Sequence, residues 1–304
     1  MSIQKTTVDW LRFRTRSDPG QILEAFRPMF GDYADMLHLG DLGRGLFGFK
    51  TSIPILLADV PVARLDYGGE SQRDWVRVDV PGKGCGFVAD WDAVDSLEEL
   101  PAAELRRTDI ALTTWEGQIT HDLVVQAHQD GRFTTNGRPP NLRTIVNSTA
   151  TEGRTCYIGQ RTSDKFLRCY EKGYELAGKM PGLTHVDGFP VEDIYRVELE
   201  LKAENTVVPW DVIGRRDQYF AGSYPFCADI LPGVEADILQ RRPERAPQRE
   251  LAAALENLRT QYGATLYTAL RAYHGDIGAV WDKVVGTTHN RHLLEAGVLL
   301  VEHD

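Results

Sequence analysis

The chain has 304 residues and a formal net charge of −10 at neutral pH, with 42% hydrophobic and 26% charged residues. These proportions are ordinary for a globular protein, and the length suffices for one large domain or two smaller ones. No run of 18 apolar residues occurs, which argues against a membrane span. The first nine residues are mostly polar and do not form a secretion signal, so we expect a cytoplasmic protein without a membrane partner.

The cysteines and the charge narrow the classes of protein further. The four cysteines are widely separated and form no Cys-x-x-Cys pair, which argues against both a zinc site and a disulfide framework. A net negative charge is the wrong sign for a nucleic-acid-binding protein. However, the charge of the whole chain governs solubility and long-range steering, and a local basic groove remains compatible with it.

Several segments alternate apolar and polar residues with a period of two, which is typical of half-buried strands. In chain order, the predicted strands are residues 8–14, 74–80, 107–113, 156–159, 166–172 and 195–202. The predicted helices are residues 19–27, 120–130, 248–270 and 276–285, and residues 91–105 are expected to contain one or two short helices. Residues 132–147 are rich in Gly, Pro, Asn and Thr and predict a long loop.

Strands in meander order with helices between them predict an α+β fold, with a mostly antiparallel central sheet and flanking helices. The composition changes after Trp210, and the segments that follow are helical in pattern. We therefore expect a catalytic domain of residues 1–210 and a C-terminal helical module of residues 211–304.

One predicted strand places a tyrosine between two cations. If residues 166–172 are extended, Arg168, Tyr170 and Lys172 share one face. A phenol is a poor nucleophile at its ordinary pKa of about 10. Flanking cations favour the phenolate and can also bind phosphate oxygens, as attack on a DNA phosphate requires. A surface tyrosine packed between arginine and lysine stems gives the same pattern.

The predicted strand at residues 195–202 carries Glu198 and Glu200 on one face, between Arg196 and Lys202. Two carboxylates two residues apart on a strand project the same way and can share Mg²⁺ or Mn²⁺, which prefer oxygen ligands. The predicted metal ligands are Asp109, Glu116, Glu198 and Glu200. A solvent-exposed face held by salt bridges is the alternative interpretation.

Five motifs occur in a fixed order between residues 7 and 202. They are Thr-Val-Asp-Trp-Leu-Arg-Phe, Arg-Thr-Asp-Ile-Ala, Thr-Cys-Tyr-Ile-Gly-Gln-Arg-Thr-Ser-Asp-Lys, Leu-Arg-Cys-Tyr-Glu-Lys-Gly and Tyr-Arg-Val-Glu-Leu-Glu-Leu-Lys. In this set the chain resembles the replication initiation factor family. That family includes the Rep proteins of rolling-circle plasmids and of filamentous or related phages and prophages.

The resemblance implies a metal-dependent, tyrosine-dependent endonuclease that nicks one DNA strand at a replication origin. It would stay attached to the 5′ phosphate while the 3′ hydroxyl primes synthesis, and would then rejoin the displaced strand. The implied partners are origin DNA, as a single strand or a hairpin, a host helicase and further copies of the chain. The implied location is the cytoplasm of a bacterial host.

The family's motifs assign roles to individual residues. Tyr170 matches the tyrosine of its Arg-x-Tyr-x-Lys motif, Glu198 and Glu200 match its acidic strand, and Asp109 matches the aspartate of Arg-x-Asp-x-Ala. The catalytic set is therefore Tyr170, Arg168 and Lys172. The predicted DNA-binding residues are Arg161, Lys165, Arg196 and Lys202.

The chain also departs from the family's pattern. Thr113 and Thr114 stand where members often carry a further acidic residue, and no His-x-His metal motif occurs, so the metal assignment depends on carboxylates. The rival nucleophiles are Tyr157, Tyr174 and Tyr195. A non-catalytic DNA-binding regulator with the same fold is the alternative function.

Overall fold

The computed structural model describes residues 5–135, 137–147, 152–180, 182–240, 247–295 and 298–300. Contacts divide the chain into two compact units, residues 1–241 and 242–304. The first unit continues past residue 210, the boundary expected from the sequence. Helices α6 (Arg216–Ala221) and α7 (Pro225–Ile230) extend it, and their buried Phe220 and Phe226 belong to its core.

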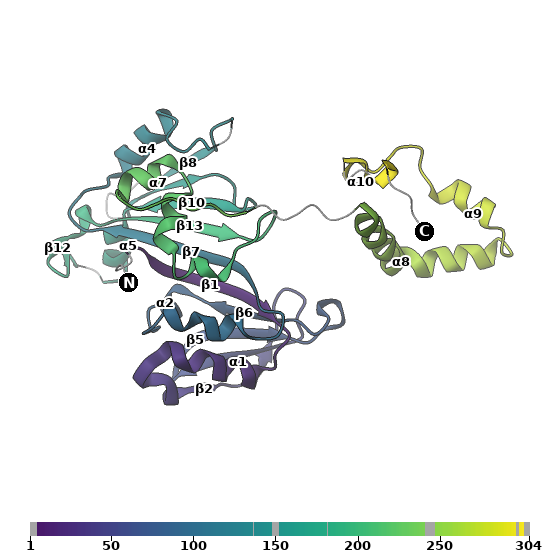
Figure 1. The fold of residues 1–304 in the computed structure, drawn as a ribbon, viewed down its shortest axis with the longest axis horizontal. Coiled ribbons are helices and arrows are strands. Elements are labelled where there is room, and N and C mark those ends of the chain that lie inside the picture. Colours follow the sequence, from purple (N-terminus) through teal and green to yellow (C-terminus); the bar gives the residue numbers. More distant parts are fainter. Residues whose placement is uncertain are drawn as a thin grey trace. The chain divides into compact units, whose positions relative to one another are not determined.

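A large antiparallel sheet organises the first unit (Figure 1). Its strands lie in the order β2-β4-β5-β6-β1-β7-β13-β10-β9-β8, with β3 paired to β4. The strands are β1 (Thr7–Thr15), β2 (Leu37–Leu39), β3 (Gly43–Arg44), β4 (Thr51–Leu57), β5 (Val60–Tyr67), β6 (Val76–Val80), β7 (Glu104–Thr114), β8 (Leu142–Val146), β9 (Arg154–Ile158), β10 (Lys165–Tyr170) and β13 (Tyr195–Lys202). A separate hairpin pairs β11 (His185–Val186) with β12 (Phe189–Pro190).

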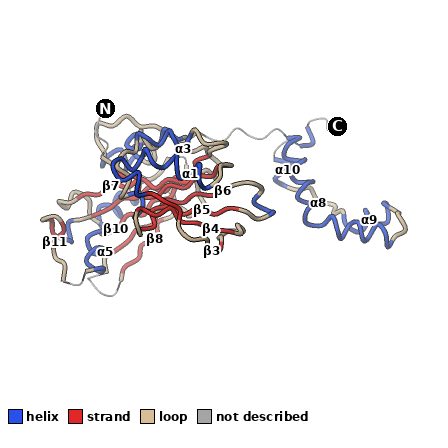
Figure 2. The backbone as a smooth tube through the Cα atoms, turned by 90° about the horizontal axis from the view of Figure 1, so that it is seen from below, coloured by secondary structure: helices blue, strands red, loops and turns tan. Residues whose placement is uncertain are grey.

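The remaining helices of the first unit are short. They are α1 (Pro19–Phe26), α2 (Gly82–Cys85), α3 (Asp95–Glu98), α4 (His121–Gln129) and α5 (Lys172–Lys179). Helix α1 begins as the sequence predicts, because the Asp18 side chain accepts hydrogen bonds from the backbone of Gly20 and Gln21 and Pro19 occupies the first turn. Figure 2 shows α1 and α3 lying to one side of the strands.

The register separates the sheet into a core face and a polar face. In β7 and β13, Ile110 lies opposite Leu199 and Leu112 opposite Val197, and these side chains join the core. The alternate positions carry charge, because successive side chains of a strand point to opposite faces. We call the side of the sheet that bears Asp109, Glu198, Glu200 and their neighbours the polar face.

The second unit contains α8 (Pro247–Ala272), α9 (Ile277–Val284) and α10 (Arg291–Glu295). Figure 1 shows them as separate helices joined by short connections. No helix in the described ranges is long and apolar enough to cross a membrane.

The α+β fold with an antiparallel sheet and C-terminal helices is confirmed. Two local predictions were wrong. Strand β8 lies inside residues 132–147, expected to be a loop, and pairs with β9 along its whole length. Strand β10 ends at Tyr170, so Lys172 begins helix α5 instead of extending the strand face of Arg168.

Candidate active site

Tyr170 lies on the polar face, at the end of β10. Antiparallel pairing places it directly opposite Arg196 of β13, and places Arg168 opposite Glu198. The Arg168 guanidinium carbon is 4.6 Å from the centroid of the tyrosine ring, and the Lys172 Nζ atom is 5.6 Å from it. The structure therefore brings together the three residues predicted to be catalytic, although Lys172 reaches the ring from a helix.

Burial dominates the electrostatics of Tyr170. The residue is only 6% exposed. Burial raises the pKa of its hydroxyl, the charges of Arg196 and Arg168 lower that pKa, and Glu198 raises it. The sequence predicted that the cations would prevail. In the folded chain the loss of solvation outweighs them, because the phenolate would lie in a nearly closed environment beside a carboxylate.

Three predicted carboxylates meet on the neighbouring strands. Asp109 of β7 lies directly opposite Glu200 of β13, and Glu198 lies two residue pairs further along, at the next position on the same face. The Arg107 guanidinium donates two hydrogen bonds to Asp109, of 2.8 and 2.6 Å, and approaches Glu200 at 3.0 Å. The Lys202 ammonium contacts the other oxygen of Glu200 at 2.9 Å. Arg107 thus bridges the two strands at their facing carboxylates.

Asp109 carries the most perturbed carboxyl group of this cluster. Burial raises its pKa to about 6, and the charges of Glu200 and Glu198 act in the same direction. The hydrogen bonds and charge of Arg107 oppose the increase. The cause is an aspartate that is almost completely buried among other carboxylates.

Glu198 connects the carboxylates to the tyrosine. It accepts a hydrogen bond of 2.7 Å from Arg168, the cation that lies against the ring of Tyr170. Among the described residues, the Nε atom of Arg168 is buried without a hydrogen-bond partner. The Arg168 side chain as a whole is still 37% exposed, so its guanidinium group can also meet a phosphate oxygen.

The donor chemistry of this cluster suits a divalent cation. Asp109, Glu198 and Glu200 offer hard oxygen ligands. Burial is the main cause of the raised pKa of Asp109, and the charges of Glu200 and Glu198 add to it. Arg107 already neutralises two of these carboxylates. The part of the chain that the structure describes contains no group of three acidic, histidine or cysteine side chains in metal-binding geometry. Metal binding would therefore require Arg107 to release its carboxylates.

The other predicted site residues separate into two groups. Arg161 lies against the rings of Tyr157 and Phe166, and its carbonyl oxygen accepts a hydrogen bond from Lys202. Glu116 does not join the carboxylates, because it is exposed in the loop after β7 and hydrogen-bonds with Gln118. Arg161 therefore lies near the carboxylates, whereas Glu116 does not.

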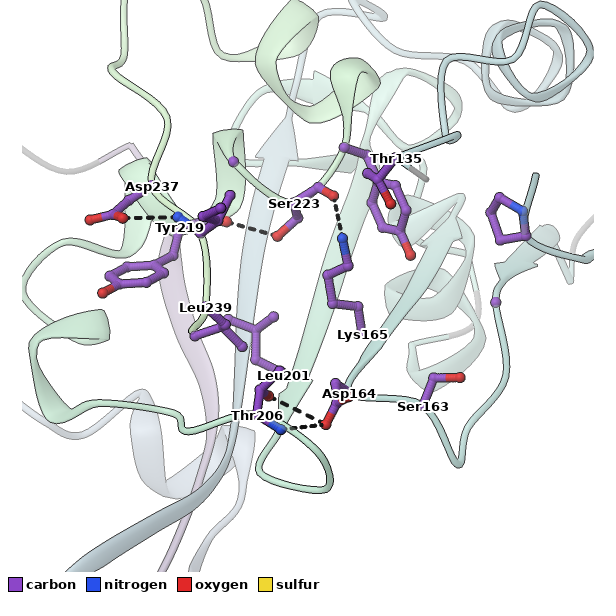
Figure 3. A pocket seen from close by; sticks show the side chains of 15 residues that line it. Thr135, Ser163, Asp164, Lys165, Leu201, Thr206, Tyr219, Ser223, Asp237 and Leu239 are labelled. Atoms are coloured by element: carbon purple, nitrogen blue, oxygen red, sulfur yellow. Dashed lines mark hydrogen bonds between the residues drawn. The ribbon is translucent and has the colours of Figure 1, made fainter. Parts of the chain in front are cut away.

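Lys165 lies on the opposite face from Tyr170. It stands opposite Leu201, a core residue, in the pairing of β10 with β13. Figure 3 shows its side chain in a cavity of about 500 Å³, with the Nζ atom 2.8 Å from the carbonyl oxygen of Ser223. Burial lowers its pKa. The predicted group of DNA-binding cations is therefore divided between two faces.

The three rival tyrosines differ in where they lie relative to Tyr170. Tyr195 faces the core and is 2% exposed, which places it on the wrong side of the sheet for the carboxylates. Tyr174 belongs to helix α5. Tyr157 of β9 lies opposite Arg168 on the polar face, half-buried and stacked on Phe166 with ring centroids 5.6 Å apart. Tyr157 is the rival that shares the face of Tyr170.

Asp9 is a site residue that the sequence did not reveal. A bulge in β1 between Val8 and Trp10 displaces it from the regular ladder, and it accepts a hydrogen bond of 3.1 Å from Arg196. Arg196 is thus held between Asp9 and Thr113, opposite Tyr170. The sequence gives only one sign of this irregularity, the adjacent apolar residues Trp10 and Leu11, which break the alternation of the strand.

Comparison with known proteins places the chain in a family. A family model described as replication initiation factor matches residues 103–267, which is over half of the chain. The chain therefore belongs to the replication initiation factor family.

One solved structure shares the fold, a rolling circle replication initiator protein from Geobacillus stearothermophilus. The match has a TM-score of 0.54 and 20% sequence identity, and covers 80% of this chain and 88% of that chain. No curated protein matches the chain.

Proposed function

We propose that this protein initiates rolling-circle replication by nicking and rejoining one DNA strand at an origin. The observation that carries the proposal is the position of Tyr170 beside Arg168 and opposite Arg196, on the same sheet face as Glu198 and Glu200. A nucleophile, phosphate-binding cations and acidic ligands are the groups that strand transfer through a phosphotyrosine requires. Membership of the replication initiation factor family and the likeness of fold support the proposal.

The proposed reaction is a transesterification. The oxygen of Tyr170 attacks the scissile phosphorus, forms a 5′-phosphotyrosine and breaks the bond to the 3′ oxygen. The phenolic proton leaves to solvent, and the 3′ oxygen takes up a proton to become the hydroxyl that primes synthesis. Attack by a 3′ hydroxyl on the phosphotyrosine reverses the step and rejoins the strand. Arg168 and Arg196 lower the pKa of Tyr170 and would hold the phosphate oxygens.

Asp109, Glu198 and Glu200 would hold a divalent cation, Mg²⁺ or Mn²⁺. When bound, such an ion polarises the scissile phosphate. The remaining chemistry belongs to the side chains of the chain. Lys172 lies near the ring of Tyr170 and bonds to Glu175 at 2.9 Å, so it would supply positive charge next to the nucleophile.

Covalent capture tests this proposal. The purified protein is incubated with single-stranded and supercoiled DNA carrying a candidate origin, with Mn²⁺ or with a chelator, and resolved on a denaturing gel. We expect a protein–DNA adduct that requires the metal and disappears in Tyr170→Phe. Tyr157→Phe is the matched control, because Tyr157 lies on the same face. An adduct lost in Tyr157→Phe and retained in Tyr170→Phe would move the nucleophile to β9.

A DNA-binding regulator without nicking activity is the second candidate. Two observations favour it: burial raises the pKa of Tyr170, and arginines already pair with the carboxylates. Salt-sensitive binding to origin DNA, with no adduct under any metal condition, would support the regulator and contradict the enzyme.

We propose that the C-terminal helices serve origin recognition or oligomerisation. Helix α8 exposes Leu255, Leu258, Tyr262 and Tyr267, apolar side chains that a partner surface would cover. Sedimentation over a range of protein concentrations, repeated with origin DNA, separates the two roles. Self-association without DNA supports oligomerisation, and a monomer at all concentrations contradicts it. A host helicase would be a further partner of an initiator.

A further inference from the structure

The polar face continues beyond the tyrosine into a second pocket of about 260 Å³. We call it the arginine pocket; its lining includes Arg12, Arg14, Arg77, Arg107, Lys202 and Trp75. These residues come from β1, β6, β7 and β13 and from the residue just before β6. None of these cations except Lys202 was expected from the sequence to contact DNA. The pocket therefore needs an explanation of its own.

Buried aspartates pair with the cations of the arginine pocket. Asp79 pairs with Arg12 and with Arg77, each at 2.5 Å, and Asp66 lies near Arg77 at 3.9 Å. The two aspartates are more deeply buried than Arg12, and the Asp66 side chain is only 1% exposed. Buried carboxylates thus fix the guanidinium groups, whose more exposed parts line the cavity. Among the described residues, the Nη1 atom of Arg77 is buried without a hydrogen-bond partner.

Aromatic rings accompany these cations. The guanidinium carbon of Arg14 is 4.0 Å from the ring centroid of Trp75, and that of Arg77 is 3.9 Å from the ring of Phe47. Phe47 is 69% exposed, although it is a large apolar side chain. Layers of guanidinium planes and aromatic rings are surfaces on which unpaired bases stack.

The backbone at Phe47 is strained. Its φ angle is 55°, a conformation that bulky residues rarely adopt. Gln72, which lines the arginine pocket, donates a hydrogen bond of 3.1 Å to the Phe47 carbonyl oxygen. A strained backbone that presents an exposed ring, and is held by a residue of the pocket, points to a binding role for that ring.

The arginine pocket is continuous with the candidate active site. Arg107 lines this pocket and also the smaller cavity formed with Arg168, Glu198 and Glu200. Four strand spacings separate β10, which carries Tyr170, from β6. At about 4.8 Å per spacing this distance is roughly 19 Å. A stacked strand rises about 3.4 Å per nucleotide, so about six nucleotides would span it.

We propose that the arginine pocket binds unpaired nucleotides of the strand that Tyr170 cuts, a few nucleotides from the scissile phosphate. This subsite rests on the proposed function, in which Tyr170 acts on a single strand. The guanidinium groups contact phosphates. Trp75, which lines the pocket, and Phe47, which lies beside it against Arg77, stack bases. Duplex DNA fits less well, because its bases are paired and their faces are not available to a protein ring.

Binding is measured in the Tyr170→Phe background, without metal, so that it does not depend on cleavage. Fluorescence anisotropy compares single-stranded oligonucleotides that extend about four or about twelve nucleotides to either side of the candidate nick. Phe47→Ala and Trp75→Leu remove the rings. Tyr33→Ala is the matched control, because Tyr33 is an exposed aromatic residue of the same unit, 56% exposed, outside the pocket.

We expect Phe47→Ala and Trp75→Leu to weaken binding of the long oligonucleotide about fivefold or more, on one side of the nick. Binding of the short oligonucleotide, binding of a duplex and the behaviour of Tyr33→Ala should stay within twofold, roughly. Equal binding by all variants would overturn the subsite, as would an equal loss for long, short and duplex DNA.

Photocrosslinking of a bromodeoxyuridine oligonucleotide to unsubstituted protein tests the subsite without relying on variants. Crosslinks to peptides containing Phe47 or Trp75 support it, and crosslinks confined to other peptides contradict it. The two proposals can fail separately. Ring-dependent binding without any covalent adduct removes the nicking function and keeps the subsite. Adduct formation with no dependence on Phe47 or Trp75 removes the subsite alone.

Discussion

Tyr170 lies on the polar face of the sheet and Tyr195 on the core face, so the two tyrosines allow the faces to be compared. They lie on the adjacent strands β10 and β13, both are nearly buried, and burial raises the pKa of both. Around Tyr170 are Arg168 and Arg196, whereas Tyr195 belongs to the hydrophobic core cluster. Burial and a raised pKa therefore do not identify a reactive tyrosine by themselves. The cations and carboxylates on the same face distinguish Tyr170.

The largest expected effect follows directly from this comparison. Tyr170→Phe should reduce adduct formation at least about a thousandfold, because no other group would attack the phosphate. Tyr195→Phe should retain it. Within the described part of the chain, the Tyr195 hydroxyl is buried without a hydrogen-bond partner, so its removal leaves no partner unsatisfied. Denaturing gels measure the adduct, and urea unfolding should show a change below about 1 kcal/mol for Tyr195→Phe.

Loss of the adduct in Tyr195→Phe, with an unchanged free energy of unfolding, would contradict the assignment of the reaction to the polar face. It would show that a side chain among core residues takes part in the reaction. The sheet would then have to open during catalysis.

The second prediction compares two glutamates. Glu200→Gln should raise the Mn²⁺ concentration needed for half-maximal cleavage by at least about tenfold, because it removes a carboxylate directly opposite Asp109. Glu116→Gln is the matched control, because Glu116 is exposed in the loop after β7 and hydrogen-bonds with Gln118. Its metal requirement should not change. Metal titrations of cleavage check both.

Equal metal requirements in these two variants would place the cation elsewhere. A higher requirement in Glu116→Gln alone would assign to Glu116 the role of the acidic residue that family members often carry where this chain has Thr113 and Thr114. Circular dichroism should accompany both titrations, because Glu200 also pairs with Arg107 and Lys202.

The alternation of charge was enough to predict the polar face. In β13 every second residue is charged, and the structure places these residues on the face opposite the core. If the strands that carry Asp109 and Glu200 are neighbours in the sheet, the same alternation predicts that the two carboxylates share a face, and in the structure they pair directly. The position of β1 between β6 and β7 could not be predicted from the sequence, because strand order depends on long-range packing that local periodicity does not encode.

Three differences between the expected and the observed positions have physical causes. Strand β8 has a mostly exposed side-chain pattern, so its residues lack the buried alternation that marks a strand. The bulge at Asp9 depends on pairing with β7, which one strand cannot reveal. Lys165 stands at the first position of β10, three residues before Arg168, so in the sequence the two cations look like part of one basic cluster. Period-two geometry sends the two side chains to opposite faces.

The third prediction uses two lysines on these opposite faces. Lys202→Met should weaken single-stranded DNA binding and reduce the slope of log affinity against log salt by about 0.7, because one phosphate contact is lost. Lys165→Met should leave that slope unchanged, since Lys165 bonds to the Ser223 carbonyl oxygen beneath the sheet. Anisotropy titrations at several salt concentrations measure the slopes. Equal slopes for both variants would mean that DNA contacts do not follow the polar face.

The smallest expected effect concerns Glu175, which bonds to Lys172 beside Tyr170. Burial would raise the pKa of Glu175, but hydrogen bonds from Lys179 and Lys172 outweigh it and lower the pKa to about 2. A carboxyl group with a lowered pKa stabilises the fold above its ordinary pKa, near 4.5, and this contribution disappears as the pH falls towards 2. The side chain is 38% exposed, so solvent screening limits the contribution to less than about 1 kcal/mol.

Glu175→Gln should therefore lower the free energy of unfolding slightly at pH 7 and converge with the unsubstituted protein as the pH approaches 2. Urea unfolding across this range measures the difference. The same substitution removes a charge that raises the pKa of Tyr170 and releases Lys172 from its ion pair. Cleavage at pH 7 should consequently be retained or slightly faster. A large loss of cleavage with unchanged stability would assign Glu175 a direct part on the polar face, because neither the ion pair nor the helix would then explain it.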